Sequence, residues 1–141
     1  MILFCDTSAL VRLYVVEEGS DLLRQQVAEA EAVVACRIAW AEAHAALSRR
    51  AREIPADALV LEQAKVALAE DWRHFVLMEV TQALVERAGD YADTFALRGY
   101  DSIQLAAAFE AARITQSPVQ FACFDSRLNK AARALGMTCL A

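Results

Sequence analysis

The sequence is poor in the residues that interrupt regular structure, with only 4 glycines and 2 prolines among its 141 residues. This scarcity excludes a collagen-like chain, a disordered chain and an all-β protein rich in tight turns. Long apolar runs are also missing, although the mean hydropathy is +0.27. No run approaches the ~20 apolar residues that span a bilayer, and Asp6 comes too early for a signal peptide. We therefore expect a compact cytoplasmic protein with a well-filled core.

Closely spaced cysteines are absent as well. The 4 cysteines lie far apart, which excludes a zinc knuckle and a CxxC redox pair. Each lies in a short apolar run and is predicted to be a buried, reduced thiol. Positive charge is in deficit, with 14 Lys and Arg against 19 Asp and Glu and a net charge of −5. The protein therefore cannot bind nucleic acid through bulk positive charge, but a local basic cluster stays possible.

Short apolar runs alternate with longer segments of helical periodicity, the pattern of an α/β domain with a parallel sheet. Strands are predicted at residues 2–5, 32–36, 75–78, 120–124 and 137–140. Helices are predicted from Ser8 onward and at residues 21–31, 38–52, 56–72, 81–97, 101–115 and 126–135, with a break at residues 98–100. No repeat or linker divides the chain, so we expect one domain over residues 1–141.

Four acidic residues stand out because their neighbours are apolar or small. Asp6 follows the first predicted strand, Asp125 follows the fourth, Glu42 lies inside the helix after the second, and Asp101 opens the helix before the fourth. Ligands of open parallel sheets bind at the carboxyl ends of the strands. Carboxylates gathered there would repel one another unless a cation joined them. Oxygen ligands without thiolate or imidazole favour Mg²⁺ or Mn²⁺, which suits phosphodiester hydrolysis.

Helix capping is the alternative explanation for three of these residues. Asp6, Asp101 and Asp125 each precede a predicted helix, and aspartate is a favoured N-cap. The segment from Asp101 to Gln104 also fits a capping box. Glu42 falls inside its helix, so capping does not account for it.

The chain resembles the PIN-domain family, and within it the VapC-type toxin ribonucleases of type II toxin–antitoxin pairs. The resemblance rests on four blocks in order, at residues 6–10, 39–47, 100–108 and 124–128. It implies a three-layer α/β/α domain with a central, mostly parallel sheet of about five strands. It also implies an endoribonuclease that depends on Mg²⁺ (or Mn²⁺), with Asp6, Glu42, Asp101 and Asp125 as catalytic and metal-binding residues. The implied partners are an RNA substrate, a second copy of the chain in a homodimer, and a small cognate antitoxin.

Several neighbouring residues are candidates for supporting roles. Thr7 and Ser8 could hydrogen-bond a ligating carboxylate, although local turn chemistry also explains them. Basic residues close to the four blocks are candidate phosphate contacts: Arg12, Arg37, Arg98, Arg127 and Lys130.

Other functions fit the sequence less well or stay open beside this one. A haloacid-dehalogenase-like phosphatase needs a second Asp where this chain has Ser8, and a receiver domain needs an acidic neighbour for Asp6. A PIN-domain nuclease of RNA processing or decay that has no antitoxin stays open. So does a non-catalytic PIN-like binding module whose carboxylates only cap helices.

Overall fold

The computed structural model describes residues 1–140; Ala141, the last residue of the predicted domain, lies outside the described residues. Within residues 1–140, five parallel strands form one sheet in the order β3-β2-β1-β4-β5. The strands are β1 (Ile2–Cys5), β2 (Val33–Cys36), β3 (Val76–Met78), β4 (Val119–Ala122) and β5 (Thr138–Cys139).

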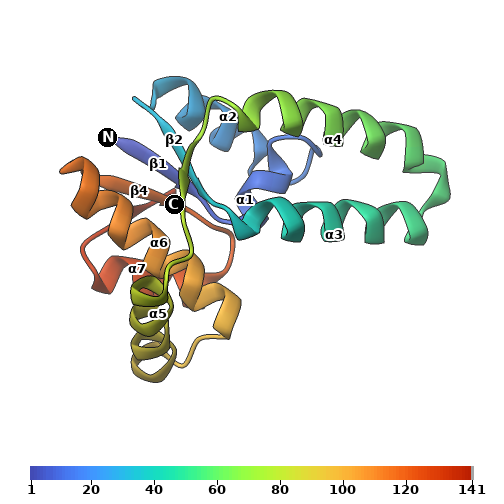
Figure 1. The fold of residues 1–141 in the computed structure, drawn as a ribbon. Coiled ribbons are helices and arrows are strands. Elements are labelled where there is room, and N and C mark those ends of the chain that lie inside the picture. The colour runs from blue at the N-terminus through green and yellow to red at the C-terminus, as the bar shows by residue number, and fades with distance from the viewer. Residues whose placement is uncertain (141) are drawn as a thin grey trace.

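Helices cover both faces of the sheet (Figure 1). On one face lie α1 (Thr7–Arg12), α2 (Ser20–Glu29), α3 (Ile38–Glu53) and α4 (Ala58–Trp72). On the other lie α5 (Gln82–Phe95), α6 (Gly99–Thr115) and α7 (Ser126–Ala134). A single 3-10 turn (Pro55–Asp57) joins α3 to α4, and these two helices project from the body as a long hairpin (Figure 1). No helix among residues 1–140 is long and apolar enough to cross a membrane.

The side chains of the central strand β1 point alternately to its two faces, so the core has two halves. Ile2 and Phe4 pack toward α5, α6 and α7, whereas Leu3 and Cys5 pack toward α1 to α4. Successive side chains of a strand point to opposite faces, so a strand covered on both sides is apolar throughout. The ring of Phe4 stacks on that of Phe121 in the neighbouring strand, with 5.7 Å between ring centroids. The three-layer α/β/α prediction is confirmed, and the sheet is parallel at every pairing.

Two predicted boundaries near the acidic residues are wrong. The helix predicted to open at Asp101 begins at Gly99, because Ala96 takes a left-handed conformation that ends α5 and Arg98 is extended. Gly99 therefore occupies the first position of a helix, where its N–H needs no partner in the helix, rather than a break. The fourth strand ends at Ala122 instead of residue 124, so Asp125 follows it after two further residues.

Gly19 is a position where the backbone requires glycine. Its φ is +88°, and a Cβ there would overlap the ring of Phe124. Gly89, by contrast, lies in α5, and a Cβ added to it would meet nothing within 4 Å. Gly19→Ala is expected to destabilise the protein by about 1–3 kcal/mol. Gly89→Ala is expected to stabilise it by up to ~1 kcal/mol, the helix preference of alanine over glycine. Urea unfolding of both variants measures the two changes, and equal midpoints would contradict the strain assigned to Gly19.

Candidate active site

The strand order places a crevice at the carboxyl ends of β1 and β4. The chain runs outward from β1 through β2 to β3, and then returns to the other side of β1 with β4 and β5. This reversal is the place where open α/β sheets bind their ligands. The backbone N–H of Asp6 donates to the carbonyl of Ala122 at 3.1 Å, so the end of β1 is fixed against the end of β4.

Asp6 directly follows β1 and is 6% exposed. Its Oδ1 accepts hydrogen bonds from the Ser8 hydroxyl at 2.7 Å and from the backbone N–H of Ala9 at 3.0 Å. Asp6 therefore caps α1, as the capping alternative predicted. Burial raises the pKa of Asp6 above its ordinary value, and the nearby charge of Asp101 raises it further, although the hydrogen bonds from Cys123, Ala9 and Ser8 oppose the shift.

Asp101 lies in the first turn of α6 and makes no capping bond. Arg98 is the N-cap residue of this helix, so the capping explanation and the capping box predicted for Asp101 are both wrong. The side chain is partly buried. Burial raises its pKa, the charge of Asp125 adds to that shift, and the guanidinium of Arg98 opposes it. Asp101 is thus the carboxylate that is electrostatically coupled to both Asp6 and Asp125.

Asp125 is exposed at the start of α7 and shares a cleft with Asp101. Its Oδ1 accepts from the backbone N–H groups of Arg127 at 2.9 Å and Leu128 at 3.1 Å, so it caps α7. The cleft has a volume of about 280 Å³. Its lining is almost entirely polar: Leu97, Arg98, Asp101, Asp125, Ser126 and Arg127.

Glu42 joins the other carboxylates through intermediaries. It lies in α3, where its Oε1 accepts from the Thr7 hydroxyl at 2.7 Å and from the Gln104 amide at 2.9 Å. Thr7 adjoins Asp6 in sequence, and Gln104 lies one helical turn from Asp101. Charge interactions therefore couple Asp101 to Asp6 and to Asp125, only Asp101 and Asp125 of the four line the cleft, and Glu42 is linked to them through Thr7 and Gln104.

The donor set suits a hard divalent cation in its chemistry. All four predicted ligands are carboxylates, and the raised pKa values of Asp6 and Asp101 record first the cost of burying these groups and then the repulsion from a neighbouring carboxylate. Among residues 1–140, no group of three or more His, Cys, Asp or Glu side chains could hold a metal ion as it stands. The carboxylates thus influence one another electrostatically, but they do not form a complete coordination sphere.

The supporting residues were predicted in part. The hydrogen bonds from Thr7 to Glu42 and from Ser8 to Asp6 confirm that both hydroxyls hold a carboxylate. Gln104 was missed as a site residue, because the capping-box interpretation assigned its side chain to the helix terminus. A usable signal was its position: an amide in an otherwise apolar helical stretch, three residues after Asp101. Cys5, Cys36 and Cys123 are free and buried as predicted, and the backbone N–H of Asp125 donates to Cys123 Sγ at 3.2 Å.

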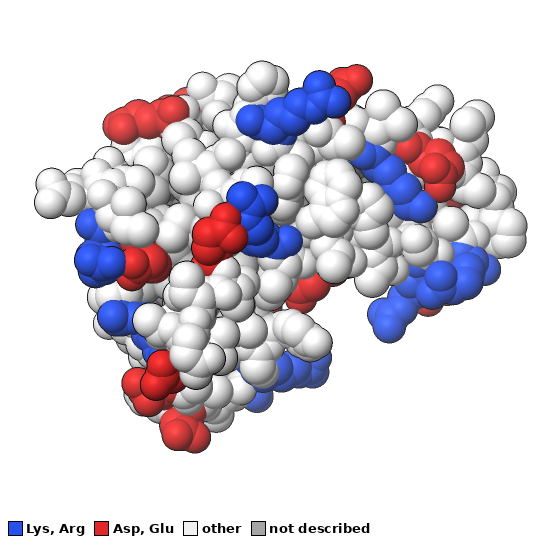
Figure 2. All heavy atoms as spheres, viewed as in Figure 1, with Lys and Arg blue, Asp and Glu red and all other residues white. Residues whose placement is uncertain are grey.

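Four of the five candidate phosphate contacts separate into two groups, and Lys130 is exposed without lining the acidic cleft. Arg98 and Arg127 line the acidic cleft. Arg12 instead lies over the ring of Phe124, with its Cζ 4.1 Å from the centroid, and Arg37 pairs with Glu79. Figure 2 shows acidic and basic side chains interspersed over the face in view, without a continuous basic surface. The positive charge at this cleft therefore comes from individual arginines and not from a basic surface.

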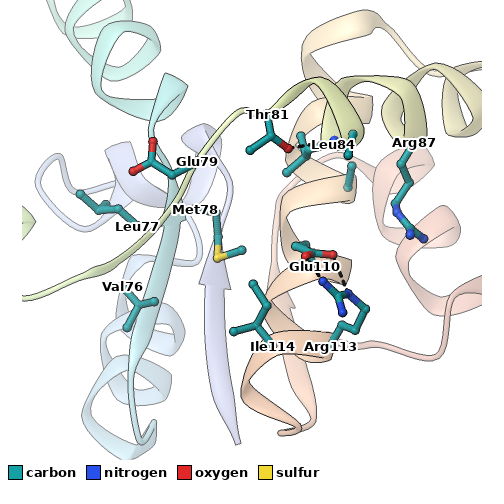
Figure 3. A pocket seen from close by; sticks show the side chains of 12 residues that line it. Val76, Leu77, Met78, Glu79, Thr81, Leu84, Arg87, Glu110, Arg113 and Ile114 are labelled. Atoms are coloured by element: carbon teal, nitrogen blue, oxygen red, sulfur yellow. Dashed lines mark hydrogen bonds and ion pairs between the residues drawn. The ribbon is translucent and has the colours of Figure 1, made fainter.

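A larger cavity of about 420 Å³ lies away from these carboxylates. It opens between β3 and the helices α5 and α6 (Figure 3). Its lining is mainly apolar, with Val76, Met78, Leu84 and Ile114 facing it beside the ion pair of Arg113 with Glu110. None of the four predicted site residues lines it. Size alone therefore does not identify the cleft that holds the candidate residues.

Comparisons with known proteins agree with this fold. The sequence model of the PIN domain matches residues 3–134. The chain belongs to the PIN-domain family, which confirms the resemblance noted in the sequence.

Individual relatives show which members of the family the chain is similar to. Ribonuclease VapC45 of Mycobacterium tuberculosis is 32% identical over 140 residues, which span 96% of this chain and 92% of the relative. Among solved structures, VapC20 of M. tuberculosis, a sarcin–ricin loop cleaving toxin, superposes with a TM-score of 0.67 at 20% identity, covering 92% of this chain and 94% of its own. A toxin–antitoxin complex from Klebsiella pneumoniae gives a TM-score of 0.55 at 19% identity, with 85% and 84% covered. The two structures are similar in fold.

The raised pKa values predict an unusual dependence of stability on pH in metal-free protein. The unfolded chain releases its carboxyl protons near pH 3.8, whereas folded Asp6 and Asp101 hold theirs to higher pH. The folded state then binds more protons, so the stability that this contributes is complete below pH 3.8 and is lost as pH rises through the folded pKa values.

Asp101→Asn removes one of these groups. In chelator, the stability of the wild type should therefore fall relative to that of Asp101→Asn as the pH rises above 3.8. Thermal unfolding of both proteins across this range measures the difference. A constant difference would contradict the raised pKa of Asp101.

Proposed function

We propose that the protein is an endoribonuclease that hydrolyses RNA phosphodiester bonds with the help of Mg²⁺ or Mn²⁺, and that it is the toxin of a VapBC-type toxin–antitoxin pair. The observation that carries the proposal is the coupling of Asp6, Asp101 and Asp125 at the crevice between β1 and β4. Carboxylates held at such a cost are suited to a cation more than to a purely structural role. The ribonuclease relative at 32% identity, matched over nearly its whole length, supports the same activity.

In this proposal Asp6 and Asp101 hold the cation, Glu42 shares it or orients the attacking water, and Asp125 completes the acidic wall. When bound, the ion supplies Lewis acidity toward the phosphoryl group and helps to ionise water. Ser8 and the N–H of Ala9 hold Oδ1 of Asp6, which fixes the orientation of the carboxylate that would bind the ion. Arg98 and Arg127, on the same cleft, bind the phosphate and orient it toward these carboxylates.

The family and the similar structures support the proposed partners. One of the similar structures is a complex of a toxin with its antitoxin, which supports a small antitoxin as the partner of this chain. The homodimer implied by the family resemblance is part of the same proposal. Isolation of the protein from its own cells together with a short second chain would support this arrangement.

Loss of the proposed ligands should abolish cleavage. Asp6→Asn keeps an oxygen for capping α1 and Asp101→Asn disturbs no cap, so both variants should fold. We expect each to reduce Mn²⁺-dependent cleavage of total RNA by roughly 100-fold or more, since a catalytic ion contributes several kcal/mol to the transition state.

Glu110→Gln is the matched control, because it makes the same kind of change on α6 at a position that lines the other cavity. It should cleave RNA at the wild-type rate. Full activity in Asp6→Asn and Asp101→Asn, with a chelator-insensitive wild type, would refute the proposed chemistry and favour a binding module.

The salt dependence of RNA binding tests the role proposed for Arg98 and Arg127. Replacement of both Arg98 and Arg127 by Gln should weaken RNA binding and reduce the slope of log K against log salt by about 0.7 for each phosphate that the variant no longer neutralises. Arg113→Gln, near the other end of α6 and paired with Glu110, should leave the slope unchanged. Binding of a single-stranded RNA in metal-free buffer, at several salt concentrations, measures the slope for both variants. An unchanged slope in the double variant would place the RNA elsewhere.

A further inference from the structure

Gln104 is a buried amide whose hydrogen bonds connect three separate helices. It lies in α6 and is 3% exposed. Its Nε2 donates to Glu42 Oε1 in α3 at 2.9 Å and to Thr7 Oγ1 in α1 at 3.2 Å. Side chains of a helix lean toward its N-terminus. The amide therefore reaches back along the face that Gln104 shares with Asp101, toward the acidic residues.

The hydrogen bonds form a closed triangle whose donors and acceptors are determined. The Thr7 hydroxyl has a single proton, which it donates to Glu42 Oε1 at 2.7 Å. The threonine oxygen can then only accept from Gln104, and the carboxylate accepts from both. Only the NH₂ end of the amide satisfies both contacts, so the orientation of the Gln104 side chain follows from its partners.

The other end of the amide shows that this arrangement is costly. Gln104 Oε1 is buried and has no hydrogen-bond partner among the described residues. Ile103 and the run from Leu105 to Ala108 surround it in sequence, so an apolar side chain would suit the packing of α6 without an unsatisfied carbonyl. An apolar residue would therefore pack as well as the amide does. What distinguishes Gln104 is the pair of hydrogen bonds that it donates to Glu42 and Thr7.

We propose that Gln104 is a positioning residue, which together with Thr7 fixes Oε1 of Glu42 and leaves Oε2 of that carboxylate to the divalent ion and its water. This inference rests on the proposed function. Among residues 1–140, both donors to Glu42 converge on Oε1, and no hydrogen bond reaches Oε2. A carboxylate held by one oxygen loses rotational freedom while its second oxygen stays available, which is how residues behind a metal ligand raise affinity.

Gln104→Met tests the proposal, because methionine keeps the length and bulk of the side chain and removes both donors. We expect Mn²⁺ affinity, measured by calorimetry without RNA, to fall about tenfold or more. The kcat for RNA cleavage should fall similarly with KM unchanged. The Tm in chelator should stay within about 3 °C of the wild type, since the unsatisfied carbonyl leaves with the amide.

Ser102→Ala is the matched control on the same helix. Ser102 is 2% exposed and its hydroxyl donates only to the carbonyl of Gly99, so the change removes a buried hydrogen bond without affecting Glu42. It should leave Mn²⁺ affinity unchanged. Thr7→Val removes the other donor to Glu42 Oε1 and should weaken Mn²⁺ binding in the same direction as Gln104→Met.

A double-variant comparison separates positioning from packing. If Gln104 acts through Glu42, then Gln104→Met added to Glu42→Gln should weaken Mn²⁺ binding no further. A full additional loss in the double variant would overturn the inference, as would a lowered Tm with intact Mn²⁺ affinity in Gln104→Met. If Asp6→Asn abolishes Mn²⁺ binding and Gln104→Met does not change it, the proposed function stands and this inference fails. A wild-type protein that binds no Mn²⁺ overturns both.

Discussion

The candidate site at the ends of β1 and β4 depends on the cost of withdrawing carboxylates from water, to which the repulsion between them adds. Asp6 follows the central strand and is almost fully buried, and Asp101 is brought against it by α6. Within the described part of the chain, neither carboxylate has a buried basic partner; Arg98 acts on Asp101 from an exposed position. The folded chain therefore carries a local electrostatic cost that a bound cation would relieve. The polar lining of the cleft and the proposed chemistry follow from this one constraint.

Capping and ion binding, which the sequence presents as alternatives, are compatible in this geometry. Asp6 and Asp125 each use Oδ1 to accept the backbone N–H groups at the start of a helix. A cap of this kind fixes the χ angles of the side chain and leaves its second oxygen outside the cap. The helix terminus thus holds the carboxylate in a fixed orientation. Asp101 is different, since it lies inside the first turn of α6 without a capping bond, and its placement is explained by the cleft alone.

Much of the architecture was predictable because buried parallel strands and amphipathic helices leave strong patterns. The apolar runs around Leu3, Val34 and Phe121 became β1, β2 and β4, and the acidic residues after them fell at one edge of the sheet. Local backbone geometry was not predictable in the same way. The left-handed conformation of Ala96 ends α5 at a residue that carries no terminator signal, and it allows α6 to begin at Gly99. Because of this shift, Asp101 lies within the first turn of α6 instead of at the predicted cap.

The role of Gln104 was beyond reach of the sequence for a related reason. Its partners lie 62 and 97 residues away in the chain, and only the packing of α1, α3 and α6 against one another brings them together. A polar residue in an apolar helix signals that some tertiary partner exists, but not which one. The four carboxylates were recognisable because each carries chemistry by itself, whereas Gln104 acquires its function only through Glu42 and Thr7. Residues that act through others are therefore the part of a site that most needs a structure.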